Sequence, residues 1–144
     1  MIRTFRWRPG RRTAGVAMLA GLLAASASAP AHHAFSAEFD GDKPLEIRGV
    51  VTKAKWVNPH SWLYLDVKGA DGAVTNWGFE FGAPFALQQK GLTKAVLPPG
   101  TEVLVKGYKS KSGEPYGYAV TVALADGRVF QTGGAQDAPG TQQR

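Results

Sequence analysis

The pattern that decides the fold stands at residues 61–68, SWLYLDVK, and continues at residues 73–81, AVTNWGFEF. From Leu63 onward every second residue of the first stretch is aliphatic, which is the period of a strand that buries one face. The second stretch alternates in the same way, with Trp77 and the two phenylalanines on one side. Because residues 70–72, Ala-Asp-Gly, are typical of a tight turn, we expect an antiparallel hairpin.

Strands and one short helix continue this pattern on both sides of the hairpin. A first strand is expected over residues 45–56, where Gly49 marks a bulge or sharp bend. Residues 83–90, APFALQQK, predict a helix that ends before Gly91. The remaining expected strands cover residues 101–109, 116–124 and 128–131. This order predicts an all-β domain with one short helix, either an OB-like Greek-key barrel or another small antiparallel barrel or sandwich.

The first 31 residues have the composition of a secretory signal peptide. Five arginines precede an uncharged run of Ala, Leu, Gly and Val over about residues 14–25, and small residues follow it. The run is shorter than the roughly 20 residues of a membrane-spanning helix, and no later segment is as apolar. We therefore expect export to the periplasm or medium by general secretion, with a twin-arginine signal at Arg11-Arg12 as the alternative. Cleavage is expected after Ala31, or otherwise after Ala27, and the first choice makes His32 the mature N-terminus.

The mature chain is expected to form one domain, residues 32–131, in which residues 32–44 are an irregular arm. A disordered tail, residues 132–144, is expected to follow, because it is rich in Gly and Gln and has little to bury. The chain has 17 basic and 11 acidic residues, but five of the basic ones lie in the signal peptide. The mature domain is therefore nearly neutral, and it lacks the basic surface that nucleic-acid binding requires.

The three histidines of the chain, His32, His33 and His60, are the candidate metal ligands. If His32 is the first residue, its amine and ring Nδ1 can chelate one metal ion, and a second imidazole would complete a T-shaped site. If the cut falls one residue earlier, Ala31-His32-His33 places a histidine third, which allows a square-planar chelate with two backbone amides. Divalent copper binds such nitrogen ligands most tightly of the first-row series. The chain has no cysteine, and both methionines leave with the signal peptide, which argues against a Cu(I) carrier.

Two other interpretations of the histidines stay open. Zinc would need the same imidazoles and a carboxylate, from Glu38 or Asp40. A pair of histidines near a terminus can also be merely solvated, and His60 can cap the turn that Asn58-Pro59 predicts.

A second candidate function, from a different class, is a metal-free OB-like adaptor that binds a small molecule, a peptide or an envelope protein. Its candidate ligand-binding residues are Trp56, Asn58, Trp62 and Trp77. Many aromatic residues of a small barrel are core, so Trp56 and Trp62, which flank His60, are the two expected at the surface. No nucleophile motif, phosphate loop or metalloprotease motif is present, so an enzyme is the less favoured interpretation.

Five segments together resemble a family of uncharacterised exported bacterial proteins, over residues 32–131. They are HHAFSAEFD at 32–40, WVNPHSWLYLDV at 56–67, VTNWGFEFGAPFALQQKGL at 74–92, PPGTEVLVKGY at 98–108 and VALADGR at 122–128. The resemblance implies export and a small β-barrel and assigns no activity. The family pattern falls on His32, His33, Phe35, Asn58, Pro59, His60, Trp77 and Glu80. The visible departure is Tyr116-Gly117-Tyr118, where polar residues are more usual.

Overall fold

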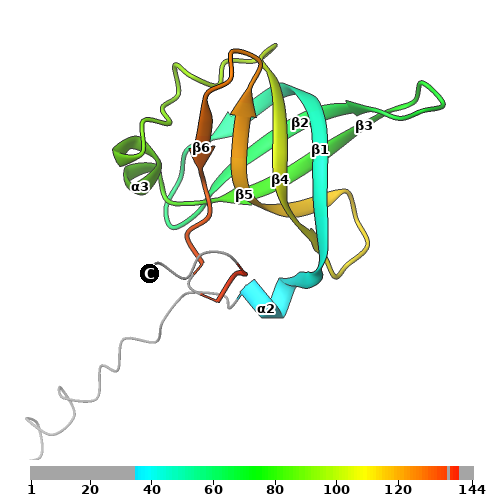
Figure 1. The fold of residues 1–144 in the computed structure, drawn as a ribbon, viewed down its shortest axis with the longest axis horizontal. Coiled ribbons are helices and arrows are strands. Elements are labelled where there is room, and N and C mark those ends of the chain that lie inside the picture. The colour runs from blue at the N-terminus through cyan, green and yellow to red at the C-terminus, as the bar shows by residue number, and fades with distance from the viewer. Residues whose placement is uncertain (1–34, 136, 140–144) are drawn as a thin grey trace, which may run out of the picture. The chain divides into compact units, whose positions relative to one another are not determined.

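The computed structural model describes residues 35–135 and 137–139, so the expected signal peptide and His32 and His33 lie outside the described residues. Strands dominate, as predicted, and two short helices accompany them (Figure 1). The helices are α2 (Phe35–Glu38) and α3 (Pro84–Gln89). The strands are β1 (Phe39–Lys55), β2 (Ser61–Lys68), β3 (Val74–Phe81), β4 (Glu102–Ser110), β5 (Tyr116–Leu124) and β6 (Val129–Gln131). Within the described part, no helix is long and apolar enough to cross a membrane.

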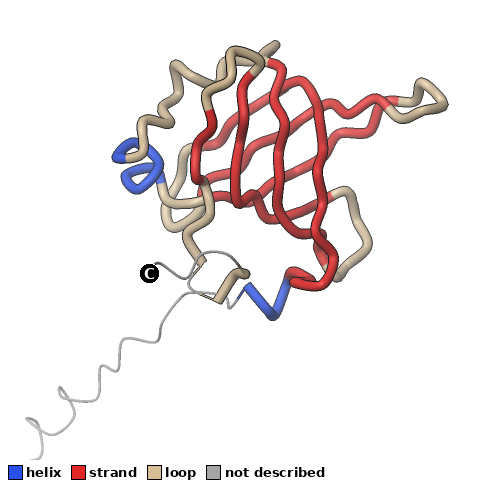
Figure 2. The backbone as a smooth tube through the Cα atoms, in the orientation of Figure 1, coloured by secondary structure: helices blue, strands red, loops and turns tan. Residues whose placement is uncertain are grey.

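The six strands form one sheet in the order β3-β2-β1-β4-β5-β6, and neighbours in this order are antiparallel. A parallel pairing of β3 with β5 links the two sides of the sheet, with Gly78 opposite Tyr116 and Glu80 opposite Tyr118. The strands β1 to β5 therefore make a closed ring of hydrogen-bonded neighbours (Figure 2). This closure places the end of β3 beside the start of β5, where the candidate site lies.

The main core cluster fills the space between the inner faces of the strands. The predicted alternation of β2 is confirmed, because Leu63 and Leu65 are fully buried. On β3, Phe79 and Phe81 face the same core, as expected. The other buried members of this cluster are Val51, Leu87, Leu92, Leu97, Val103, Val105, Ala119, Val122 and Phe130.

A second, smaller cluster lies on the outer face of β4 and β5. Its buried members are Phe35, Phe39, Tyr118 and Ala138, and Tyr108, Tyr116, Val120 and Ala135 pack against them. Successive residues of β5 face opposite sides of a strand, so Tyr116 and Tyr118 point outward while Ala119, one position on, belongs to the core. Both ends of the described chain are attached to the domain through this second cluster.

The N-terminal arm is therefore more ordered than the sequence indicates. The first strand begins at Phe39 rather than near Leu45, and α2 precedes it. Phe35 is only 3% exposed and its ring lies 5.3 Å from that of Tyr118. Burial of Phe35 and Phe39 stabilises the ordered conformation of this otherwise polar stretch. β1 has register irregularities between Phe39 and Pro44 and between Val51 and Lys53, and the second lies slightly after the position expected at Gly49.

Residues 132–135 and 137–139, here called the C-terminal strap, pack against the domain. Thr132 is fully buried and its hydroxyl donates to the Ala119 carbonyl at 3.0 Å. Ala138 is 2% exposed. For these residues the structure differs from the disordered tail that composition predicts. Ala135 and Ala138 pack in the second cluster, and backbone N–H groups of the strap donate hydrogen bonds to Tyr118.

Candidate functional site

His60 ends the connection between β1 and β2, one residue before the sheet resumes. The backbone N–H of Ser61 donates to the Gly82 carbonyl at 3.2 Å, which ties the start of β2 to the end of β3. Trp62 and Glu80 are opposite each other in the β2–β3 ladder. Side chains on one face of neighbouring strands meet, so this register brings Glu80 to the start of β2, next to His60.

The imidazole of His60 contacts the carboxylate of Glu80, with 2.5 Å between Nδ1 and Oε1. The two side chains are 27% and 11% exposed, so the contact is largely shielded from water. A carboxylate that accepts from Nδ1 fixes the tautomer of a neutral ring, with the lone pair on Nε2. Nε2 is therefore the atom of His60 through which it can ligate a metal.

Tyr116 extends this contact into a network. Its hydroxyl is 3.1 Å from Oε2 of Glu80 and 3.4 Å from Oε2 of Glu38, and it donates to these carboxylates. Burial, and then the charge and hydrogen bond of Glu80, raise the pKa of the Tyr116 hydroxyl far above its usual range. The phenol therefore stays protonated and acts as a donor to the carboxylates.

This arrangement predicts how stability depends on alkaline pH. The folded pKa of Tyr116 exceeds the ordinary value of 10.0, so the stability it contributes is present below pH 10 and is lost as the pH rises above it. We expect the free energy of unfolding to fall above pH 10, and to fall less steeply in Tyr116→Phe. Denaturant unfolding at a series of pH values measures this. Equal slopes for the two proteins would contradict the network.

A row of aromatic rings adjoins the network on the same outer face. The ring of Trp62 stacks on that of Tyr116 at 5.3 Å with 17° between the planes, and on that of Tyr64 at 6.5 Å. The ammonium of Lys55 lies 5.4 Å from the centre of the Tyr64 ring. Trp62 is thus a neighbour of the candidate site.

The other predicted ligand-binding residues lie elsewhere. Trp56 packs on the main core cluster, with 5.6 Å between its ring and that of Phe81. Trp77 packs on the same cluster, 5.9 Å from the ring of Phe79. Asn58 is exposed in the turn. Trp56 and Trp77 therefore pack on the core, whereas Trp62 is paired with Glu80 in the ladder and stacks on Tyr116.

The predicted metal ligands are only partly visible, because His32 and His33 lie outside the described residues. Among residues 35–135 and 137–139, no group of three or more histidine, aspartate or glutamate side chains is arranged to hold a metal ion. Asp40, one of the carboxylates considered for zinc, forms an ion pair with Lys43 at 3.0 Å. Glu38, the other, belongs to the Tyr116 network.

The arm reaches the site by way of Glu38. Three consecutive polar contacts, none longer than 3.4 Å, lead from Glu38 through Tyr116 and Glu80 to His60. His33 lies five positions before Glu38, but Phe35–Glu38 is helical, so the extended reach of His33 from Phe35 is at most about 7 Å.

Sequence reasoning noted Tyr116 only as an aromatic residue at a departure from the family pattern, and Glu80 only as a member of that pattern. Glu80 carries a signal, since it is an acidic residue on the polar face of a strand next to the histidine turn. Tyr116 approaches Glu80 only because β3 and β5 pair in parallel, and that pairing leaves no local trace in the sequence.

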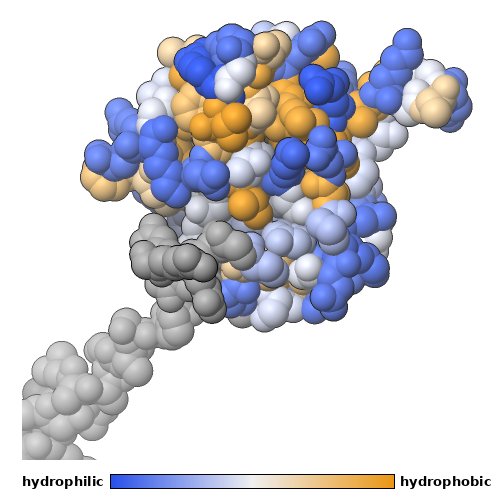
Figure 3. All heavy atoms as spheres, in the orientation of Figure 1, coloured by the Kyte–Doolittle hydropathy of each residue, from blue (hydrophilic) through white to orange (hydrophobic). Residues whose placement is uncertain are grey.

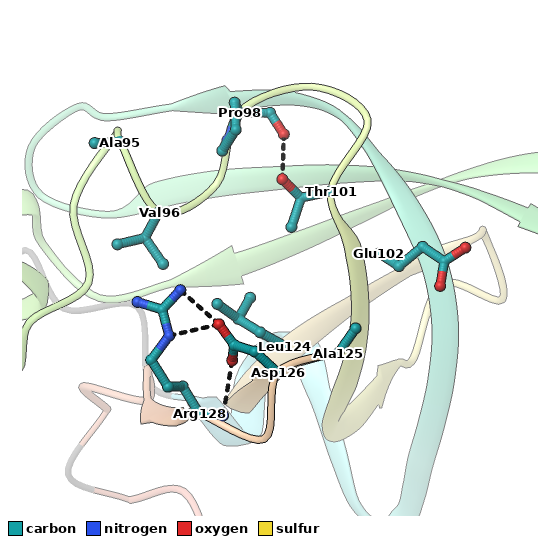
Figure 4. A pocket seen from close by; sticks show the side chains of 9 residues that line it. All are labelled: Ala95, Val96, Pro98, Thr101, Glu102, Leu124, Ala125, Asp126 and Arg128. Carbon is teal, nitrogen blue, oxygen red and sulfur yellow. Dashed lines mark hydrogen bonds and ion pairs between the residues drawn. The ribbon is translucent and has the colours of Figure 1, made fainter.

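A shallow depression of about 410 Å³ lies away from this network (Figure 4). It is lined by the loop before β4, the start of β4 and the turn after β5, whereas Tyr116 is at the opposite end of β5. Its charged groups are Glu102 and an ion pair in which Arg128 contacts Asp126 at 2.8 Å. On the face of the molecule seen in the space-filling view, apolar residues are interspersed with polar ones (Figure 3). The depression holds no histidine and no buried carboxylate, so the network is the better candidate site.

Of three comparisons with known proteins, one gives a match, and that match is to a family of unknown function. Neither the curated proteins nor the solved structures gave a match. The sequence profile of one family matches residues 19–119, which cover the candidate network from Glu38 to Tyr116. This chain belongs to DUF6152, a family of unknown function.

Proposed function

We propose that this protein is an exported binding module that holds Cu(II) through its N-terminal histidines, His32 and His33, together with His60. The observation that carries the proposal is the contact between Nδ1 of His60 and the shielded carboxylate of Glu80. Histidines that ligate metals almost always donate their other ring N–H to such a partner, which fixes the ring and makes it a better ligand.

The arm supplies the second part of the argument. Glu38, three positions after the first described residue, joins the network of Tyr116 and Glu80. Signal cleavage after Ala31 would add the free amine of His32 to the imidazoles. A set of amine and imidazole nitrogens favours Cu(II) over the other divalent first-row ions, including Zn²⁺.

We further propose that the domain is an OB-like barrel. The ring order supports this, because β1 pairs with both β2 and β4, β3 pairs in parallel with β5, and α3 stands between β3 and β4. Barrels of this type present the outer side of their first strands and adjoining loops to ligands. The His60 turn between β1 and β2 occupies that position.

The metal-free adaptor is the less favoured function. To bind one ligand, its three predicted tryptophans would have to lie on one surface. Trp56 and Trp77 pack on the core, whereas Trp62 adjoins the network. The row formed by Trp62, Tyr64 and Tyr116 stays available to that hypothesis as a smaller stacking surface.

Titration of Cu(II) into two forms of the protein tests the proposed function. One form begins at His32 and the other at Phe35, which removes the two arm histidines and keeps the described domain. We expect one Cu(II) per chain in the first form, and binding weaker by at least ~100-fold in the second, because two chelating nitrogens and an imidazole are lost. Equal binding by the two forms, or no binding by the first, would overturn the proposal.

A further inference from the structure

The two ends of the described chain are joined by one carboxylate. Oδ1 of Asp137 accepts from the backbone N–H of Phe35 at 3.0 Å, and Oδ2 accepts from that of Ser36 at 3.1 Å. These two hydrogen bonds lower the pKa of the Asp137 carboxyl below its ordinary value. Asp137 is therefore charged at neutral pH and accepts with both oxygens.

The strap that carries Asp137 is fixed to β5. The hydroxyl of Tyr118 accepts from the backbone N–H groups of Gly134 and Ala135, both at 2.6 Å. The backbone N–H of Thr132 donates to the Val120 carbonyl at 2.8 Å. β5 is hydrogen-bonded to β3, β4 and β6. The strap is therefore bonded to a strand that is itself fixed in the sheet, and this gives Asp137 a defined position.

The arm is held from its other side by the turn between β4 and β5. The ammonium of Lys111 donates to the Ser36 carbonyl at 2.6 Å, and the backbone N–H of Lys111 donates to the Glu38 carbonyl at 2.9 Å. The ring of Phe35 is enclosed by Phe39, Tyr108 and Tyr118 at 5.3 to 5.5 Å. Asp137 thus holds the backbone of Phe35, which is two positions from His33 in the sequence.

We propose that Asp137 is a positioning residue, which holds the start of the arm on β5 so that the arm histidines are presented to His60. The metal-binding part of this inference rests on the proposed function, whereas the fixing of the arm does not. The strap lies outside the residues 19–119 that the family profile matches.

Two measurements on the chain that begins at His32 test the inference: hydrogen exchange of the Phe35 and Ser36 amides, and Cu(II) titration. The variants are Asp137→Ala, which removes both acceptors, and Asp137→Asn, which keeps one. The matched control is Asp126→Ala, because Asp126 also accepts a backbone N–H, from Arg128 at 3.0 Å, at the other end of β5.

We expect Asp137→Ala to speed exchange of both amides at least ~10-fold, as loss of charge-assisted hydrogen bonds implies, and to weaken Cu(II) binding by a similar factor. Asp137→Asn should fall between it and the wild type, and Asp126→Ala should change neither quantity. Unchanged exchange in Asp137→Ala would overturn the fixing of the arm. Faster exchange with unchanged Cu(II) binding would overturn the positioning role. A wild type that binds no Cu(II) would overturn the proposed function. The exchange rates would then still decide whether Asp137 fixes the arm.

Discussion

Replacing His60 by alanine is expected to weaken Cu(II) binding at least ~100-fold, and Glu80→Gln is expected to weaken it by about 10- to 100-fold. The first change removes the ring nitrogen that completes the proposed site. The second keeps the size of the side chain and removes the charge that orients His60 through Nδ1. Isothermal titration with Cu(II), on chains that begin at His32, measures both effects.

The matched control is Glu46→Gln. Glu46 is also a carboxylate on a strand, paired at 2.8 Å with Lys106, but both partners are more than half exposed and neither joins the Tyr116 network. Its replacement should leave Cu(II) binding unchanged. If Glu80→Gln binds as well as this control, Glu80 has no part in the site, and if His60→Ala does so, the site is not the one proposed.

Gly107→Ala is expected to destabilise the fold by about 3 kcal/mol or more, at the upper end of what overpacking costs. A Cβ atom at this position would lie 1.8 Å from the Tyr118 carbonyl oxygen and 3.2 Å from Cα of Ala119. These are backbone atoms of β5, at the point where the β4–β5 register shifts, so no side chain can move aside. Denaturant unfolding measures the loss, which should be accompanied by exposure of the second cluster around Tyr118.

Gly78→Ala is the control for this change. Gly78 is also a strand glycine, but an added Cβ would meet the Tyr64 ring at 3.5 Å, which is an ordinary contact. We expect a change of less than about 1 kcal/mol, since a strand loses little when alanine replaces glycine. If Gly107→Ala proves as mild as Gly78→Ala, the close approach of β4 to β5 is not as described.

The sequence predicts the parts of this fold that depend on local pattern. The alternation of Leu63 and Leu65 with polar or aromatic residues identifies β2 and its buried face, and the Asp-Gly turn identifies its partner β3. The helix at Pro84–Gln89 follows from its composition and its neighbouring glycine. Each of these signals comes from residues that are near one another in the chain.

The parts that the sequence does not reveal depend on contacts between distant segments. The pairing of β3 with β5 joins strands that are separated by α3 and β4, and it alone brings Tyr116 to Glu80. Taken alone, the sequence of the arm or of the strap has too few apolar residues to predict an ordered segment. Each supplies only part of the second cluster. Asp137 and Phe35 are 102 residues apart, so neither segment alone predicts their contact.

The candidate site shows the same division. His60 stands out in the sequence because it follows Asn58-Pro59 and is one of only three histidines. Its partner Glu80, and Tyr116, which contacts Glu80, are placed only when the register of β2, β3 and β5 is known. The outward-facing tyrosines at 116 and 118 thereby acquire a physical role, since Tyr116 anchors the network and Tyr118 anchors the strap.

The central claim is that export exposes a histidine N-terminus which binds copper with the help of His60. Intact-mass and metal analysis of the protein isolated from copper-supplied cells that export it tests this most directly. The account predicts a chain that begins at His32 and carries one copper ion. A mature chain that begins at another residue and carries no transition metal would contradict it.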